Sequence, residues 1–290
     1  MKIFKLASIA LISVLALAGC TPAQQIDGKV KIVASTSVWG DVAKSVGGDL
    51  VEVTSIIDSP LKDPHSYEAT ARDQLAVEKS NLVIANGGGY DDFIEKMAQS
   101  AGNKQILRIA TSVTAVSWQE NEHIWYSISA VGEAAYAIAD TLGALDKDNA
   151  LTYTTNADKF VDGITGIAAM YSEVRKNTNG YTYFATEPIA NWLLKDLGLV
   201  NKTPADFSKA IENETDVAPS VMKESLDLIK SGKIKYLVVN SQTLNSQVRQ
   251  VIDAAKNAGV REVVLSEVMP TGTGYVEWMG ANLVTVDPAK

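Results

Sequence analysis

Residues 147–177 read KDNALTYTTNADKFVDGITGIAAMYSEVRKN, and this stretch decides how the rest of the chain is organised. No proline interrupts it, and its apolar side chains recur at roughly helical spacing with polar residues between them. These apolar residues are Leu151, Phe160, Ile164, Ile167, Tyr171 and Val174. The stretch therefore predicts one long helix of ~45 Å, at about 1.5 Å per residue. Gly163 and Gly166 each cost about 1 kcal/mol in a helix interior, which a buried close crossing would explain.

On both sides of this helix, short apolar runs alternate with helical segments, the pattern of βαβ units and a mostly parallel sheet. Before the helix, we expect strands at residues 30–34, 50–57, 82–85 and 106–109 and helices at 38–46, 71–79 and 90–101. After it, we expect strands at residues 181–185, 236–239 and 262–265 and helices at 189–196, 219–230 and 246–258. The sequence thus predicts an α/β fold of two lobes with mostly parallel sheets, joined by one long rigid helix, with a ligand cleft between the lobes. The predicted units are an N-terminal lobe at 30–146, the linking helix at 147–177 and a C-terminal lobe at 178–290.

The composition is that of a folded protein. Hydrophobic residues make up 46% and charged residues 21% of the chain, which excludes disorder as its dominant state. The net charge is -8 and no basic stripe stands out, so nucleic acid is not an expected partner. A single cysteine excludes a disulfide framework and any cysteine-rich zinc fold. With only two histidines, a site that needs imidazole must use His65 or His123.

The N-terminus predicts a targeting segment that is separate from the fold. Two lysines precede an apolar run at residues 9–17, which is too short to span a bilayer but fits the core of a signal peptide. The run ends in Leu-Ala-Gly-Cys, which is similar to a bacterial lipobox. We therefore expect a signal peptide at 1–19 and a lipidated tether at 20–29, with acylated Cys20 anchoring the protein outside the bacterial cell membrane. The competing interpretation is an ordinary secretory peptide with an incidental cysteine.

Two histidines and two carboxylates lie in loops near strand ends, where ligands of open α/β sheets bind. They are His65, His123, Glu187 and Glu267. Neutral imidazole is the commonest metal ligand, and a carboxylate directly after a buried strand needs a partner such as a cation. The competing interpretations are solvated histidines and, for Glu187, helix capping. Together the four would form a metal site across the cleft, where imidazole suits zinc and carboxylate favours harder ions such as manganese.

Several short motifs occur together in this chain. They are the lipobox, Pro64-His65-Ser66-Tyr67-Glu68, Asn86-Gly87-Gly88-Gly89-Tyr90 and His123-Ile124-Trp125. With these motifs the chain resembles the solute-binding lipoproteins of zinc and manganese ABC transporters, of the cluster A-I type, over essentially the whole mature sequence. The resemblance assigns the two histidines as ligands by specific motifs. It assigns Glu187 and Glu267 by their positions at the start of lobe two and after the last strand.

The resemblance implies capture of one divalent transition metal ion, Mn2+ or Zn2+, and its delivery to the membrane permease of an ABC transporter, without chemical conversion. With the ligands split between the lobes, we expect the metal to join the lobes while the long helix limits hinge motion, and we expect a monomer. Many zinc members carry a histidine-rich loop that residues 110–122 lack, which favours manganese, whereas the intrinsic affinity order favours zinc. Asp63, Glu68 and Glu122 are candidates to orient the imidazoles.

Other function classes stay open at this point. A secreted metallohydrolase could use His65 and Glu68 with Glu267 as the base, but its metal would need an open coordination position, and no H-E-x-x-H helix is present. A glycosidase pair of Glu187 and Glu267 leaves the histidines without a role. A surface adhesin or interaction lipoprotein would show an exposed apolar patch. The three glycines at 87–89 lack nucleotide-binding spacing and predict a turn.

Overall fold

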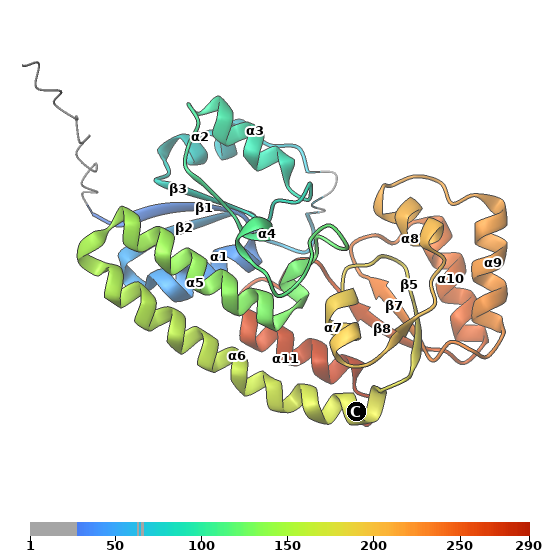
Figure 1. Ribbon diagram of the computed structural model, residues 1–290. Coiled ribbons are helices and arrows are strands. Elements are labelled where there is room, and N and C mark those ends of the chain that lie inside the picture. The colour runs from blue at the N-terminus through green and yellow to red at the C-terminus, as the bar shows by residue number, and fades with distance from the viewer. Residues whose placement is uncertain (1–27, 63, 65–66) are drawn as a thin grey trace, which may run out of the picture.

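The structure is a computed structural model that describes residues 28–62, 64 and 67–290, and it contains two parallel sheets (Figure 1). The first has the order β2-β1-β3-β4, formed by β1 (Val30–Thr36), β2 (Val51–Ile57), β3 (Leu82–Ala85) and β4 (Ile106–Arg108). The second has the order β6-β5-β7-β8, formed by β5 (Thr182–Ala185), β6 (Val200–Asn201), β7 (Tyr236–Asn240) and β8 (Arg261–Leu265). Every strand pair in the described part of the chain is parallel. The predicted α/β fold of two lobes with parallel sheets is confirmed.

The helices cover both faces of each sheet, which explains why the central strands are continuous apolar runs. In the first lobe the helices are α1 (Ser37–Gly47), α2 (Ala71–Lys79), α3 (Asp92–Ser100), α4 (Ile109–Ser112) and α5 (Ile128–Leu145). In the second they are α7 (Asn191–Asp196), α8 (Ala205–Glu212), α9 (Pro219–Lys230), α10 (Ser246–Asn257) and α11 (Tyr275–Val286). The 3-10 turns are η1 (Gly48–Leu50), η2 (Ile124–Tyr126) and η3 (Lys147–Asn149). β3 and β7 are buried at every position, as expected for strands between two helical layers.

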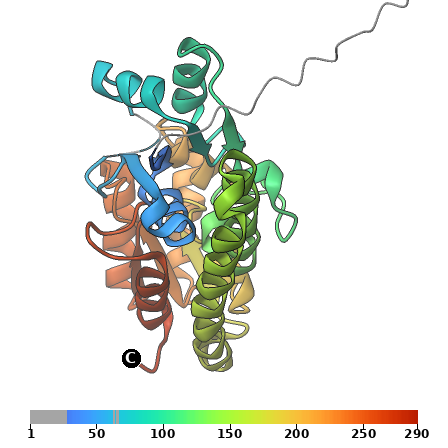
Figure 2. The same cartoon turned by 90° about the vertical axis from the view of Figure 1, so that its left-hand side faces the viewer.

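Helix α6 (Ala150–Thr178) runs along one side of the molecule from the first lobe to the second (Figure 1). Its 29 residues correspond to about 43 Å. It packs against α1, α5 and α11, and in both ribbon views it lies far from α2 and α3 (Figure 2). One hydrophobic core cluster includes side chains of both lobes and of α6. A shared core of this kind ties each lobe to the helix.

The phase of α6 differs from the predicted one in its first turn. Leu151, expected in the apolar stripe, is 80% exposed. Tyr153 is buried in its place, and its hydroxyl donates a hydrogen bond of 2.8 Å to Oδ2 of Asp146. The predicted stripe holds from Phe160 to Val174. A single leucine at the start of a helix lacks a neighbour one turn earlier to share its face, so periodicity is weakest there.

The expected close crossing at the two glycines of α6 is wrong. Gly163 and Gly166 are both exposed. A Cβ atom added at Gly166 would meet nothing within 4 Å, and one at Gly163 would come no closer than 3.7 Å, to Val276. Both residues therefore carry the conformational cost of glycine in a helix without a packing reason in the described residues.

Because Gly166 has open space around it, Gly166→Ala is expected to raise the free energy of unfolding by about 1 kcal/mol. Urea unfolding of the metal-free protein measures this change. The control is Gly88→Ala, since Gly88 has φ 71° and an added Cβ would lie 3.0 Å from Cε3 of Trp118. The control should destabilise the fold. An unchanged or lower stability of Gly166→Ala would contradict the expectation.

Helix α11 begins beside the first lobe and returns the end of the chain to the second lobe (Figure 1). It packs against α6, α1 and β8. At its start the backbone N–H of Tyr275 donates to Oδ2 of Asp41 at 2.8 Å, and the Tyr275 hydroxyl donates to the carbonyl oxygen of Trp125 at 2.8 Å. These contacts fasten the two lobes together beside α6. None of the helices in the described residues is long and apolar enough to cross a membrane.

Candidate metal centre

His123 lies immediately before η2 and is fully buried. Its Nδ1 atom is 3.0 Å from Oδ1 of Asn121, and the same oxygen accepts the backbone N–H of His123 at 2.8 Å. The orientation of this amide is set because Nδ2 of Asn121 donates to the carbonyl oxygen of Pro188 at 2.8 Å. An amide oxygen can only accept, so Nδ1 of His123 carries the proton. The lone pair is then on Nε2, as a metal ligand requires.

Asn121 was not among the residues that the sequence suggested for orienting an imidazole. Of those, the Glu68 side chain is exposed, Glu122 is partly exposed, and Asp63 lies outside the described residues. Glu122 contributes a backbone carbonyl oxygen that accepts from Nδ2 of Asn86 at 3.0 Å. No sequence pattern distinguishes Asn121, because its role depends on Pro188, which is 67 residues away in the chain.

Aromatic rings enclose His123. Its ring lies 5.2 Å from that of Trp125 and 5.8 Å from that of Tyr90, centroid to centroid. The Tyr90 and Trp125 rings are themselves 4.8 Å apart. This wall keeps water from the imidazole and lowers the local dielectric constant, so charges near His123 interact more strongly than in water.

Glu187 and Glu267 lie beyond the carboxyl ends of β5 and β8, and each side chain is only 1% exposed. Asn240, the last residue of β7, lies between them because β7 separates β5 from β8 in the sheet. Its Nδ2 atom donates to Oε2 of Glu187 at 2.6 Å and to Oε1 of Glu267 at 2.8 Å. The competing assignment of Glu187 as a helix cap is wrong, since α7 begins after Ala190 and has no side-chain cap. Two buried carboxylates thus share one neutral donor.

Tyr90 connects this pair to the first lobe. Its hydroxyl donates to Oε2 of Glu267 at 3.1 Å, while its ring packs against His123. His123 from the first lobe and Glu267 from the second therefore both contact one side chain. The arrangement offers nitrogen and oxygen donors from both lobes at their junction.

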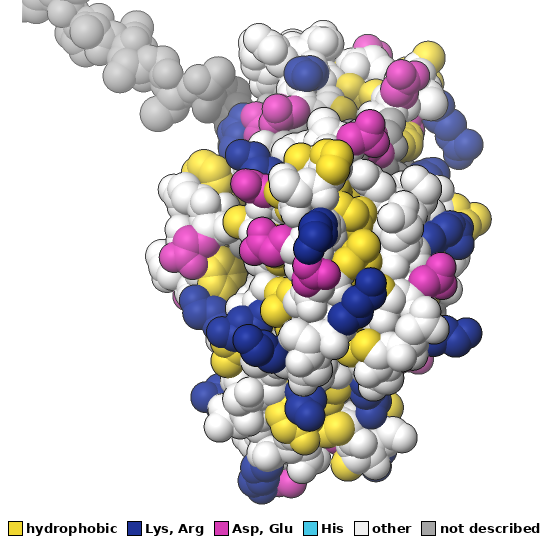
Figure 3. All heavy atoms as spheres, turned by 90° about the vertical axis from the view of Figure 1, so that its right-hand side faces the viewer, with side chains coloured by type: hydrophobic (Ala, Val, Ile, Leu, Met, Phe, Trp, Pro, Cys, Tyr) yellow, Lys and Arg dark blue, Asp and Glu magenta, His cyan; other side chains and the backbone are white. Residues whose placement is uncertain are grey.

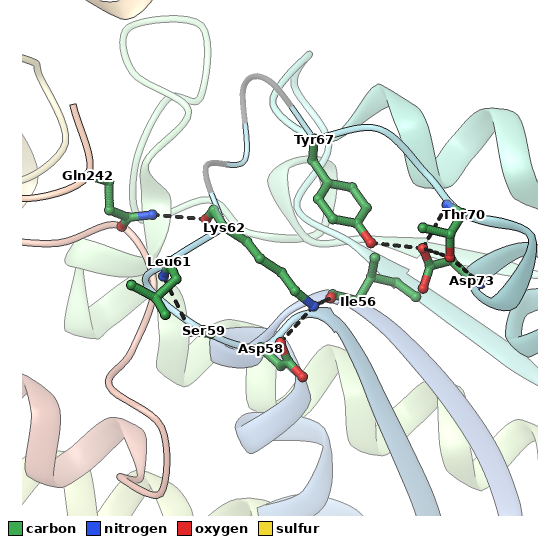
Figure 4. A network of polar contacts seen from close by, with 9 residues as sticks. All are labelled: Ile56, Asp58, Ser59, Leu61, Lys62, Tyr67, Thr70, Asp73 and Gln242. Atoms are coloured by element: carbon green, nitrogen blue, oxygen red, sulfur yellow. Dashed lines mark hydrogen bonds and ion pairs between the residues drawn. The ribbon is translucent and has the colours of Figure 1, made fainter. Parts of the chain in front are cut away.

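Gln242 links the loops of the two lobes around this junction (Figure 4). Its Oε1 atom accepts the backbone N–H groups of Glu267 at 2.8 Å and Val268 at 3.1 Å. Its Nε2 atom donates to the carbonyl oxygen of Lys62 at 3.1 Å. Lys62 is held in turn by its ammonium group, which contacts Asp58 at 2.8 Å. The strand-end loop of Glu267 is thereby tied to the segment that precedes His65.

His65 and Cys20 lie outside the described residues, so their assignments as ligand and lipidation site stay predictions. The chain after His65 is well anchored, because the Tyr67 hydroxyl donates to Oδ2 of Asp73 at 2.8 Å (Figure 4). Burial and the Asp73 carboxylate raise the pKa of Tyr67 to about 12, so this donor keeps its proton. Asp73 also forms the capping box of α2 with Thr70.

A further carboxylate, which sequence reasoning missed, lies beside His123. Among the described residues, ligand atoms of Glu122, His123 and Glu212 lie within 4.8 Å of one another. Glu212 ends α8, a helix that the apolar pattern did not predict. Glu122 and Glu212 are both partly exposed as residues, although Oε1 of Glu212 is itself buried. Glu187 and Glu267 are the stronger ligand candidates because buried charges need a partner.

The glycine turn after β3 contacts the His123 loop, because Nδ2 of Asn86 donates to the carbonyl oxygen of Glu122. Gly87, Gly88 and Gly89 all have positive φ, as the predicted turn requires. Asp91 closes the turn, since its carboxylate accepts the backbone N–H groups of Asn86 at 2.6 Å and Gly87 at 2.8 Å. Burial raises the pKa of Asp91 to about 6 in spite of these two hydrogen bonds.

The raised pKa of Asp91 predicts a specific pH dependence of stability. A carboxyl whose pKa is raised by folding contributes stability that is fully present below its unfolded value, about 4, and is lost as pH rises through about 6. Relative to Asp91→Asn, the metal-free protein should gain at most about 3 kcal/mol of stability as pH falls across this window. Urea unfolding of both proteins at several pH values measures the difference. A difference that does not vary with pH would contradict the expectation.

Comparison with known proteins identifies the family. The profile of ZnuA, described as zinc-uptake complex component A, periplasmic, matches residues 32–289. The manganese-binding lipoprotein MntA of Halalkalibacterium halodurans is 24% identical over 243 residues, covering 75% of this chain and 79% of that protein. The zinc-binding lipoprotein AdcA of Streptococcus pneumoniae is 22% identical over 303 residues, covering 95% of this chain and 58% of AdcA.

Solved structures with the same fold are metal-binding proteins. SBP FpvC from Pseudomonas aeruginosa in complex with Mn2+ has a TM-score of 0.75 and 25% sequence identity, covering 90% of this chain and 98% of that one. The Mn-bound periplasmic metal-binding protein from Candidatus Liberibacter asiaticus has a TM-score of 0.74 and 21% identity, covering 90% and 99%. Because the family profile matches nearly all of the described residues, the chain belongs to the ZnuA family, as its sequence motifs predicted.

Proposed function

We propose that this protein binds one divalent transition metal ion, manganese or zinc, outside the cytoplasmic membrane and delivers it to the permease of an ABC transporter. Two observations carry the proposal. His123 is held in the tautomer that leaves Nε2 as the donor, and the buried pair Glu187 and Glu267 is linked to it through Tyr90, which contacts both His123 and Glu267. Membership of the ZnuA family supports it. So do the names of relatives that bind manganese and zinc.

The proposed ligands are His65 and His123 from the lobe at 30–146, and Glu187 and Glu267 from the lobe at 178–290. The linking helix at 147–177 keeps these lobes in a nearly constant relation, so metal release acts on loops more than on lobe orientation. The protein acts as a monomer, is anchored through acylated Cys20 and converts no substrate. Because imidazole and carboxylate must be deprotonated to bind metal, affinity falls on acidification.

The adhesin alternative would need a large exposed apolar patch. Among the described residues, exposed Leu61, Leu151 and Val264 lie on separate elements, whereas Met170 and Val284 line one groove that also contains charged residues. On the end face of the second lobe, Lys, Arg, Asp and Glu are interspersed with apolar side chains rather than gathered into one patch (Figure 3). A metallohydrolase is not favoured either, because four protein ligands leave little room for a substrate on the metal.

The first experiment is elemental analysis of a soluble form that begins at Thr21, with competitive titration by zinc and manganese. The variant His65→Ala/His123→Ala is measured beside it. We expect one tightly held metal per chain in the parent protein and none in the variant. Absence of metal in the parent after loading at neutral pH would overturn the proposal.

A further inference from the structure

We propose that Tyr126 is a positioning residue for metal binding, because its hydroxyl holds the peptide group before Glu267 against the segment that carries His123. A donor of the second lobe is thereby fixed relative to the first lobe before the metal arrives. The inference rests on the function proposed above and uses only two of its ligands, His123 and Glu267. Tyr126 is neither a ligand nor part of any motif noted in the sequence.

The peptide group between Ser266 and Glu267 is held at both of its polar atoms. Its carbonyl oxygen accepts from the Tyr126 hydroxyl at 2.6 Å, and its N–H donates to Oε1 of Gln242 at 2.8 Å. Tyr126 lies in η2 of the first lobe and is fully buried, whereas Gln242 follows β7 of the second. Rotation of this peptide plane would break both hydrogen bonds. Together they set the direction in which the Glu267 side chain leaves the backbone.

The backbone after Glu267 is anchored to the first lobe as well. Val268 is fully buried in a hydrophobic cluster whose other buried members, among the described residues, lie on β1, β2, β3, α2 and α3. At the end of the loop, the Tyr275 hydroxyl donates to the carbonyl oxygen of Trp125 at 2.8 Å. Trp125 and Tyr126 are neighbours in η2. The Glu267 loop is therefore fastened at its start and at its end to one short segment of the first lobe.

The same segment supplies the other donor. His123 immediately precedes η2, and its carbonyl oxygen accepts the backbone N–H of Tyr126 at 3.2 Å, which closes the segment into one turn. The spatial relation between His123 and Glu267 thus passes through this turn and through one hydroxyl group. Donors that are already held in place lose less conformational freedom when they bind. The Tyr126 hydroxyl therefore raises the affinity for metal.

The test is Tyr126→Phe, which removes the hydroxyl and keeps the ring, whose centroid lies 5.4 Å from that of Trp278. Zinc is the probe, because it binds such sites more tightly than manganese and keeps weakened variants measurable. We expect the zinc affinity to fall by about 10-fold, as is typical when a group that orients a ligand is removed. The matched control is Tyr153→Phe, which removes a buried hydroxyl that donates to Asp146 near the start of α6. It should leave the zinc affinity unchanged.

A double-mutant cycle separates a positioning role from a merely structural one. In a Glu267→Gln background, Tyr126→Phe should change the zinc affinity by less than about 2-fold, because the group that it positions is no longer a strong donor. In a Glu187→Gln background it should keep its effect of about 10-fold, because Glu267 is still a ligand. A structural role predicts the same loss in both backgrounds. If Tyr126→Phe does not fold, Tyr275→Phe releases the other end of the loop and should show the same coupling to Glu267.

Hydrogen exchange of the metal-free protein gives a second measurement. We expect the Glu267 amide to exchange faster in Tyr126→Phe than in the parent protein, and at the parent rate in Tyr153→Phe. Unchanged zinc affinity in a folded Tyr126→Phe protein, or an equal loss in both glutamine backgrounds, would overturn the role of Tyr126 while leaving the transport function in place. If the parent protein bound no metal at all, the proposed function would fail and this inference with it.

Discussion

His123→Ala is expected to abolish tight metal binding, lowering the affinity for both zinc and manganese by more than about 100-fold. That exceeds the roughly 10–100-fold loss typical when a group that merely orients a ligand is removed. The physical reason is that the Nε2 lone pair of His123 has no substitute, since the chain contains only one other histidine. Competition against a chelating dye of known affinity measures the effect.

The matched control for this change is Asn121→Ala. It keeps the imidazole but removes the acceptor at Nδ1, so the loss of affinity should fall within the 10–100-fold range. Circular dichroism of both variants verifies folding. Wild-type affinity in a folded His123→Ala protein would remove His123 from the ligand set.

Glu267→Gln is expected to change stability and affinity in opposite directions. In the metal-free protein Glu267 and Glu187 are buried carboxyl groups that share the Asn240 amide donor, and Glu267 also accepts from Tyr90. When both groups of such a pair ionise, they repel by about 4 kcal/mol at a separation of about 4 Å and an effective dielectric constant of about 20. Removing one charge should therefore raise the free energy of unfolding of the metal-free protein, on the order of 2 kcal/mol. The new amide can still accept from Asn240 and donate to Tyr90.

With metal bound, the parent protein should become more stable than Glu267→Gln. At a metal concentration of a thousand times Kd, binding adds about 4 kcal/mol to the parent protein. Glu267→Gln should gain far less at the same concentration, because a neutral amide oxygen is a weaker donor. Urea unfolding with chelator and with zinc measures both effects. Glu262→Gln, an exposed position on β8, the strand that precedes Glu267, is the control and should change stability by less than about 0.5 kcal/mol. A less stable metal-free Glu267→Gln protein would contradict the expectation.

The local spacing of apolar residues was sufficient to predict most helices and strands of the fold. The predicted bounds of α2, β3 and α9 agree with the structure, and those of β7 and α10 differ by one residue. Among the elements that were missed, three have identifiable reasons. β6 has two exposed residues and thus no periodicity, α8 is short, and α11 carries apolar residues on more than one face.

What the sequence determined by itself was the alternation of strands and helices, the long helix and the residue types available for a metal site. These depend on local spacing of apolar residues and on motifs a few residues long. Only the tertiary structure decided which groups meet. Asn240 contacts Glu187 and Glu267, 53 and 27 residues away, because strand order places β7 between β5 and β8. Neighbours in a parallel sheet are distant in the chain, so no local pattern could record their contact.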